Sequence, residues 1–105
     1  MINSNKLPEL HLRGYEFCGP GTRLLERLSK GQRGVNSLDR GCLHHDLGYY
    51  VTQDIKSRHH FDKDLQDRAF SIMSDPNTKL QDKINAGLVG AIMYSKRKLG
   101  LGKLK

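Results

Sequence analysis

The 105-residue sequence lacks the features that define several protein classes. Its two cysteines are too few for a disulfide-rich scaffold, although they suffice for one bridge. No apolar run approaches the roughly 20 residues that a membrane-spanning helix needs, which excludes an integral membrane protein. Residues 1–6 contain no apolar signal-peptide segment, so the chain is either not secreted by that route or is part of a longer protein. No repeat or domain boundary is visible, and the length predicts a single domain over residues 1–105.

Acidic residues are also scarce relative to basic ones. The sequence has 18 lysines and arginines against 11 aspartates and glutamates, a formal net charge of +7. This excess favours an anionic partner, which could be nucleic acid, an acidic membrane surface or an acidic protein. Ordinary solubilising charge is the simpler explanation, and charge alone does not choose among the partners.

Apolar residues recur at helical spacing in three segments, which predicts a mostly α chain. The first helix is predicted from a cap at Asn36 or Ser37 to about Gln53. The second is predicted to end near Ser74, before a proline-containing turn, and the third follows with Thr78 as a possible cap. The predicted apolar faces comprise, in order, Leu38, Cys42, His45 and Tyr49; Phe61, Leu65, Ala69 and Ile72; and Leu80, Ile84, Leu88 and Ile92.

The remaining segments have no such period. We predict an irregular arm over residues 1–12, a short helical turn within residues 24–28, and a basic tail over residues 96–105. Gly87 and Gly90 either weaken the third helix, by roughly 1 kcal/mol each, or allow close packing against it.

A glycine-rich turn occupies residues 17–22 (FCGPGT). Two glycines flanking a proline form a tight loop whose backbone carbonyls can turn to one side. Carbonyls arranged in this way suit a hard cation such as calcium. A turn of this kind is more often only a turn, so the pattern by itself does not predict a metal site.

The first predicted helix carries residues 42–49 (CLHHDLGY). His45 lies on its apolar face with Cys42 and Tyr49, and Asp46 lies about 100° further round the helix. A buried histidine needs a hydrogen-bond partner, and a buried aspartate needs a positive charge or a metal. Taken alone, His45 is best explained as a hydrogen-bonded core residue.

Three aspartates, Asp62, Asp64 and Asp67, lie on the second predicted helix. If the first two helices pack antiparallel, Asp62 is the best candidate to hold the His45 imidazole, and the other two face solvent. A carbonyl-rich loop, a carboxylate, a histidine and a facing acid together predict a hydrolytic site. Calcium would lie between the loop and Asp46, while His45 would take a proton from water and Asp62 would fix its tautomer.

These motifs resemble a known family. The turn at residues 17–22 is similar to the YxGxG calcium loop of phospholipase A2, and residues 42–49 are similar to its CxxHDxxY motif. The compact form is closer to the phospholipase A2-like domain of parvovirus capsid proteins and of related invertebrate viral or transposon-borne proteins. The resemblance covers about residues 13–98. It implies a small, mostly α fold with a calcium loop, two antiparallel catalytic helices and a C-terminal helix.

The resemblance also implies roles for individual residues. It implies that His45 is the catalytic base, that Asp62 hydrogen-bonds this histidine, and that Tyr49 supports the aspartate. The residues implied to hold Ca2+ are Asp46, through its carboxylate, and Phe17, Gly19 and Gly21, through their backbone carbonyls.

Two structural features are implied as well. Cys18 and Cys42 are expected to pair, which by loop-closure entropy is worth roughly 3.5 kcal/mol, and Asp39 is expected to be a structural acid. The sequence departs from the family at Phe17, where tyrosine is common, although only its carbonyl would bind calcium. The short interval from His45 to Asp62 leaves out the β-wing of venom enzymes.

The implied activity is calcium-dependent hydrolysis of the sn-2 ester of glycerophospholipids. Calcium would polarise the ester carbonyl, and the Gly19 N–H could add to the oxyanion hole. The implied partner is a phospholipid membrane, preferably anionic, with no specific nucleic acid. The implied setting is a virion-associated or secreted protein that acts at membranes.

Two alternatives stay open. One is a phospholipase-like module that binds membranes or nucleic acid without turnover, against which the presence of both His45 and Asp62 argues. The other is a zinc site, although the candidate ligands lack the usual zinc-finger spacing. Those ligands are Cys42, His44, His45, His59 and His60, of which the last two are expected at a solvated helix start.

Overall fold

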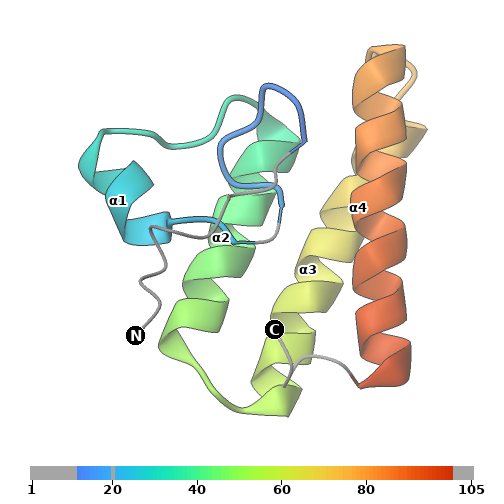
Figure 1. The fold of residues 1–105 in the computed structure, drawn as a ribbon. Helices are drawn as coiled ribbons and strands as arrows, with labels where there is room; N and C mark the ends of the chain where they lie inside the picture. The colour runs from blue at the N-terminus through green and yellow to red at the C-terminus, as the bar shows by residue number, and fades with distance from the viewer. Residues whose placement is uncertain (1–11, 20, 101–105) are drawn as a thin grey trace.

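A computed structural model describes residues 12–19 and 21–100 of the chain (Figure 1). Over these residues the fold is helical and contains no strand, which confirms the prediction of a mostly α chain. The helices are α1 (Leu24–Ser29), α2 (Ser37–Val51), α3 (Ile55–Ser74) and α4 (Leu80–Leu99). No helix in the described ranges is both long and apolar enough to cross a membrane.

The three long helices lie side by side and alternate in direction (Figure 1). Helix α3 packs against both α2 and α4, so the expected antiparallel arrangement of the first two is present. The loop that precedes α1 packs over the first half of α2. It also contacts α4, because the Tyr15 hydroxyl donates to Asp82 Oδ1 at 3.1 Å. The core is built from this loop and the three long helices and comprises Phe17, Cys18, Leu38, Cys42, Leu43, Leu65, Ala69, Ala86, Val89 and Met93.

Helix α2 begins where the sequence predicts. The Asn36 side chain accepts a hydrogen bond from the backbone N–H of Asp39 at 2.9 Å, so Asn36 is the N-cap. The helix ends at Val51, two residues before the predicted end at Gln53. Its predicted apolar face is buried, which places His45 in the interior.

Helix α3 begins at Ile55, well before the first residue of its predicted apolar face. Its first turns carry few apolar residues, and the side chain buried there is that of Arg58. Arg58 is 2% exposed, and its guanidinium donates to the backbone carbonyls of Tyr49 and Thr52 at 2.9 and 2.8 Å. The start of α3 is thereby fastened to the end of α2. As a result His59 is half-buried rather than solvated.

Helix α4 corrects two predictions. Thr78 does not cap it: the Thr78 hydroxyl donates to the Ile72 carbonyl at 2.8 Å and so caps the end of α3. The predicted apolar face of α4 does not form its buried side either. The members of that face are between 47% and 74% exposed: Leu80, Ile84, Leu88 and Ile92.

Small residues determine which side of α4 packs against α3. A Cβ added at Gly90 would overlap the ring of Phe70, and one added at Gly87 would crowd Met73. Close approach of the two helices therefore requires the glycine face, and the larger aliphatic residues turn outward. Of the two explanations, close packing is correct for Gly90. The buried residues of α4 are Asn85, Ala86, Val89, Gly90 and Met93.

The ends of the described chain bear on two further predictions. Of the predicted basic tail, residues 96–99 form the last turn of α4, which Gly100 ends with a left-handed φ of 68°. Residues 101–105 lie outside the described residues, as do residues 1–11 of the predicted irregular arm. Leu12 is described, and its N–H donates to the Cys18 carbonyl at 2.9 Å.

Candidate active site

Asp39 fastens the glycine-rich loop to α2. Its carboxylate is fully buried and accepts from the backbone N–H groups of Phe17 at 2.8 Å, Glu16 at 2.9 Å and Val35 at 3.0 Å. A carboxylate that accepts three N–H groups is satisfied by the fold itself. All three of these donors are backbone N–H groups, so the contacts indicate that Asp39 has a structural role.

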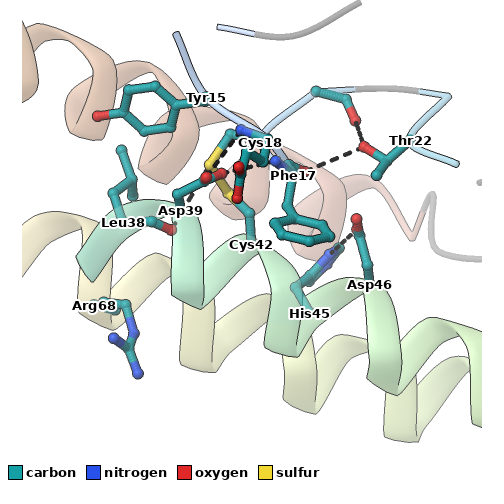
Figure 2. The surroundings of a disulfide bond; sticks show 12 residues. Tyr15, Phe17, Cys18, Thr22, Leu38, Asp39, Cys42, His45, Asp46 and Arg68 are labelled. Atoms are coloured by element: carbon teal, nitrogen blue, oxygen red, sulfur yellow. Dashed lines mark hydrogen bonds and ion pairs between the residues drawn. A yellow bond between two sulfur atoms is a disulfide. The ribbon is translucent and has the colours of Figure 1, made fainter. Parts of the chain in front are cut away.

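A disulfide between Cys18 and Cys42 makes the second attachment (Figure 2). The expected pairing is confirmed, and no described cysteine is free. Because the bridge joins the loop to the third residue before His45, it holds the loop against the part of α2 that carries the predicted site.

Two carbonyls of the loop lie near the same hydrogen-bond donor. The Thr22 hydroxyl lies 3.2 Å from the Phe17 carbonyl oxygen and 3.0 Å from that of Gly19, so one atom is within hydrogen-bond distance of both. Gly21 has a φ of 78°, a left-handed conformation that glycine adopts readily. Figure 2 shows the Asp46 carboxylate pointing from α2 toward this loop. The donors brought together here are hard oxygens, which suit calcium better than zinc.

The alternative zinc site is not formed. Within residues 12–19 and 21–100, no three His, Cys, Asp or Glu side chains gather as a metal site would require. Cys42 is consumed by the disulfide. A cation at the loop would therefore depend mainly on backbone oxygens.

His45 and Asp62 meet in the interior. His45 Nε2 is 2.6 Å from Asp62 Oδ1, and the Tyr49 hydroxyl donates to the same oxygen at 2.7 Å. An ionised carboxylate can only accept, so the proton of a neutral His45 lies on Nε2. Nδ1 then carries the lone pair, and it lies 3.8 Å from Asp46 Oδ1, on the loop side (Figure 2). The arrangement can accept a proton at Nδ1, on the side of the Asp46 carboxylate.

The surroundings set the proton affinities of this cluster. Burial acts to lower the pKa of His45, but its interactions with the carboxylates of Asp46 and Asp62 outweigh burial and leave the pKa raised. Burial acts to raise the pKa of Asp62, but donation from His45 and Tyr49, with the charge of Lys96, holds it below its ordinary value. Burial and the neighbouring carboxylate both raise the pKa of Tyr49, which therefore stays protonated as a donor.

The other two aspartates of α3 face solvent, as expected. Asp64 is 64% exposed beside His60, and Asp67 is 57% exposed and paired with Lys63. Neither contacts His45 in the described structure. The structure thus places Asp62 alone, among the three, beside the imidazole.

Sequence reasoning missed two cations at the site. Lys96 Nζ lies 3.6 Å from Asp62 Oδ1 and 4.3 Å from the centre of the Tyr49 ring. The Arg58 guanidinium lies 4.6 Å from the centre of the same ring. A signal for Lys96 was present, since Val89, Met93 and Lys96 follow at i, i+4 and i+7 on the buried side of α4. Lys96 was instead assigned to a predicted basic tail, so this spacing was not recognised.

Comparison with known proteins adds one finding. A family model described as the phospholipase A2-like domain matches residues 8–96 of the chain. The matched range includes the glycine-rich loop, α2 and α3 in full, and α4 as far as Lys96. No curated protein and no solved structure matched the chain.

Proposed function

Because the chain belongs to the phospholipase A2-like domain family, we propose that it is a calcium-dependent phospholipase A2. The reaction would be hydrolysis of the sn-2 ester of glycerophospholipids, which yields a lysophospholipid and a fatty acid. The observation that carries the proposal is the buried His45–Asp62 pair, 2.6 Å apart, whose second ring nitrogen lies 3.8 Å from Asp46 Oδ1.

His45 would act as the general base. Its Nδ1 would take a proton from a water molecule as that water attacks the ester carbonyl. The imidazolium that forms would donate from Nε2 to Asp62, whose negative charge stabilises it. Tyr49 would keep the carboxylate oriented through its own hydrogen bond at 2.7 Å. The raised pKa of His45 favours proton uptake, because the protonated ring gains two carboxylate partners.

Calcium is the cofactor that fits this site. The proposed ligands are the Asp46 carboxylate and the backbone carbonyls of Phe17, Gly19 and Gly21. When bound, calcium would supply Lewis-acid polarisation of the ester carbonyl. The proposal is supported by the convergence of the Phe17 and Gly19 carbonyls on one hydroxyl and by the direction of Asp46 (Figure 2). Calcium takes six to eight oxygen ligands, so these four residues would leave places for water and substrate.

An anionic phospholipid membrane is the proposed partner, and a secreted or virion-associated protein the proposed setting. The net charge of +7 supports an attraction to anionic lipid, at about 1 kcal/mol for each lysine or arginine close to the surface. Attraction of this kind is screened by salt, so adhesion should weaken as ionic strength rises.

The test is the release of sn-2 fatty acid from phosphatidylglycerol vesicles, with calcium or with a chelator. We expect release by the wild-type protein only with calcium. His45→Ala and Asp46→Asn should each lower the rate at least about a hundredfold, since both remove an essential part of the reaction. Asp67→Asn is the matched control: it removes the same charge from an exposed position and should keep the wild-type rate.

Two results would contradict the proposal. Release that is insensitive to chelator and to Asp46→Asn would remove the metal assignment. Vesicle binding without release under any condition would favour the alternative of a binding module without turnover. Binding measured at low and high salt, on anionic and zwitterionic vesicles, separates adhesion from catalysis.

A further inference from the structure

We propose that Lys96 is a positioning residue whose ammonium keeps the buried Asp62 carboxylate ionised and thereby keeps the His45 proton on Nε2. The inference rests on the proposed function, because it concerns the base of that reaction. Its starting observation is the 3.6 Å separation between Lys96 Nζ and Asp62 Oδ1, across the interface of α3 and α4.

Lys96 adds a permanent positive charge beside the two hydrogen-bond donors of Asp62. The side chain is fully buried, and both of its hydrogen-bond donors, His45 and Tyr49, are neutral when the ring is ready to accept a proton. Its other oxygen, Oδ2, has no hydrogen-bond partner among the residues that the structure describes. Burial favours the protonated form of a carboxyl group, and hydrogen bonds to the ionised form together with a nearby positive charge oppose it. The ammonium of Lys96 supplies the compensating charge.

The surroundings hold Lys96 in this place. Its side chain is only 18% exposed, and the ammonium lies 4.3 Å from the centre of the Tyr49 ring, a cation–π arrangement. The other charged or titratable groups facing it are His45 and Asp46 from α2, with Arg58 from α3. Lys98, two residues further along α4, is exposed and lies 5.6 Å from the ring centre of Tyr94 instead.

Loss of this charge would change the tautomer of His45. A protonated Asp62 would become a donor, and its nearest acceptor would be Nε2 of His45, 2.6 Å away. The ring proton would then lie on Nδ1, the nitrogen on the loop side. A ring in that state has no lone pair available where the water molecule must be activated. Lys96 thus acts through Asp62 and His45 and need not touch the substrate.

The kinetic test compares Lys96→Met, Lys96→Arg and Lys98→Met. The substrate is a short-chain phosphatidylcholine kept below its micelle concentration, with calcium, so that adhesion to a charged surface plays no part. We expect Lys96→Met to lower kcat by about 10- to 100-fold, as loss of an outer-shell partner typically does, with KM little changed. Lys96→Arg should recover most of the rate, because it restores the charge. Lys98→Met, which removes the same charge from an exposed position, should match the wild type.

A second measurement does not depend on hydrolysis. The 15N chemical shifts of the His45 ring, recorded at a pH where the ring is neutral, report which nitrogen carries the proton. We expect the proton on Nε2 in the wild type and in Lys96→Arg, and on Nδ1 in Lys96→Met. Circular dichroism of each variant checks that the helices are retained.

The two measurements separate the proposals. If the wild type releases no fatty acid, the proposed function fails, and the ring shifts still decide the role of Lys96. If the wild type is active but Lys96→Met keeps its kcat and its Nε2 proton, the role of Lys96 is wrong. If Lys98→Met lowers kcat as much as Lys96→Met does, the effect is one of overall charge, and the positioning role is also rejected.

Discussion

Two buried aspartates of this protein, Asp39 and Asp62, differ in their hydrogen-bond partners and therefore in their roles. Asp39 accepts from three backbone N–H groups and fixes the loop on α2. Asp62 accepts from a ring nitrogen and a phenol, beside a lysine, and has no backbone N–H among its contacts. Both are fully buried. Asp39 is held by backbone groups that do not titrate, whereas the partners of Asp62 can gain or lose protons, which is the property that the proposed reaction needs.

At the residue scale, Asp54 predicts a pH dependence of stability. Asp54 is the N-cap of α3, and donation from the Ser57 backbone N–H, together with the Ser57 hydroxyl, lowers its pKa. A depressed folded-state pKa means that this stabilisation is present above the unfolded-state value of about 3.9. It is lost as pH falls through the folded value.

The check uses Asp54→Asn, whose amide can still accept from Ser57 but cannot titrate. The difference in urea midpoint between wild type and Asp54→Asn should shrink as pH falls from about 6 to about 3. A difference that stays constant over this range would contradict the assignment.

At the scale of elements, close contact between helices decides the arrangement. Helices α3 and α4 meet where the ring of Phe70 lies against Gly90, while the aliphatic residues of α4 face outward. Hydrophobicity predicts a buried face by counting apolar residues. Helix packing also depends on how near two backbones can come, and a ring on one helix requires a small residue on the other.

This argument predicts opposite outcomes for two similar substitutions in α4. Gly90→Ala should lower the free energy of unfolding by about 1 to 3 kcal/mol, because the added methyl group overlaps the Phe70 ring. Gly87→Ala should be close to neutral or stabilising, by up to about 1 kcal/mol, since helix propensity improves and the flexible Met73 side chain can move. Urea denaturation of both variants makes the comparison; equal changes would contradict the packing argument.

At the scale of the whole molecule, one covalent bond fastens the irregular part of the chain to the helices. In residues 12–19 and 21–23, the loop before α1 has no regular secondary structure (Figure 1). It is held by Asp39, by the Cys18–Cys42 disulfide and by the Tyr15–Asp82 contact to α4. Because the converging carbonyls belong to this loop, their geometry depends on these attachments.

Removal of the bridge should cost both stability and loop order. For the 24-residue separation between the two cysteines, loop-closure entropy predicts a loss of about 3.5 kcal/mol for Cys18→Ala/Cys42→Ala. Urea denaturation measures this loss, and a reductant should lower the stability of the wild type but leave the double variant unchanged. Equal sensitivity of both proteins to reductant would show that the effect does not arise from this bond.

Local sequence determined the helices of this protein and its main chemical groups. Helical periodicity predicted the three long helices, and the cap at Asn36 and the end of α3 at Ser74 follow from local chemistry. The motifs at residues 17–22 and 42–49 singled out the loop and His45, and the family resemblance implied the disulfide. Local patterns are sufficient for such features because their causes lie within a few residues of chain.

Only the tertiary structure decided which faces meet. In the structure the aliphatic residues of α4 face outward, and Arg58 is buried at the start of α3. Lys96, predicted to lie in a basic tail, lies beside the carboxylate of Asp62. The charge and polarity of a residue can be read from the sequence, but its surroundings depend on contacts between distant segments. Lys96 and Asp62 are 34 positions apart, and no local pattern relates them. Their meeting depends on the glycines that let α4 approach α3, which is a property of packing.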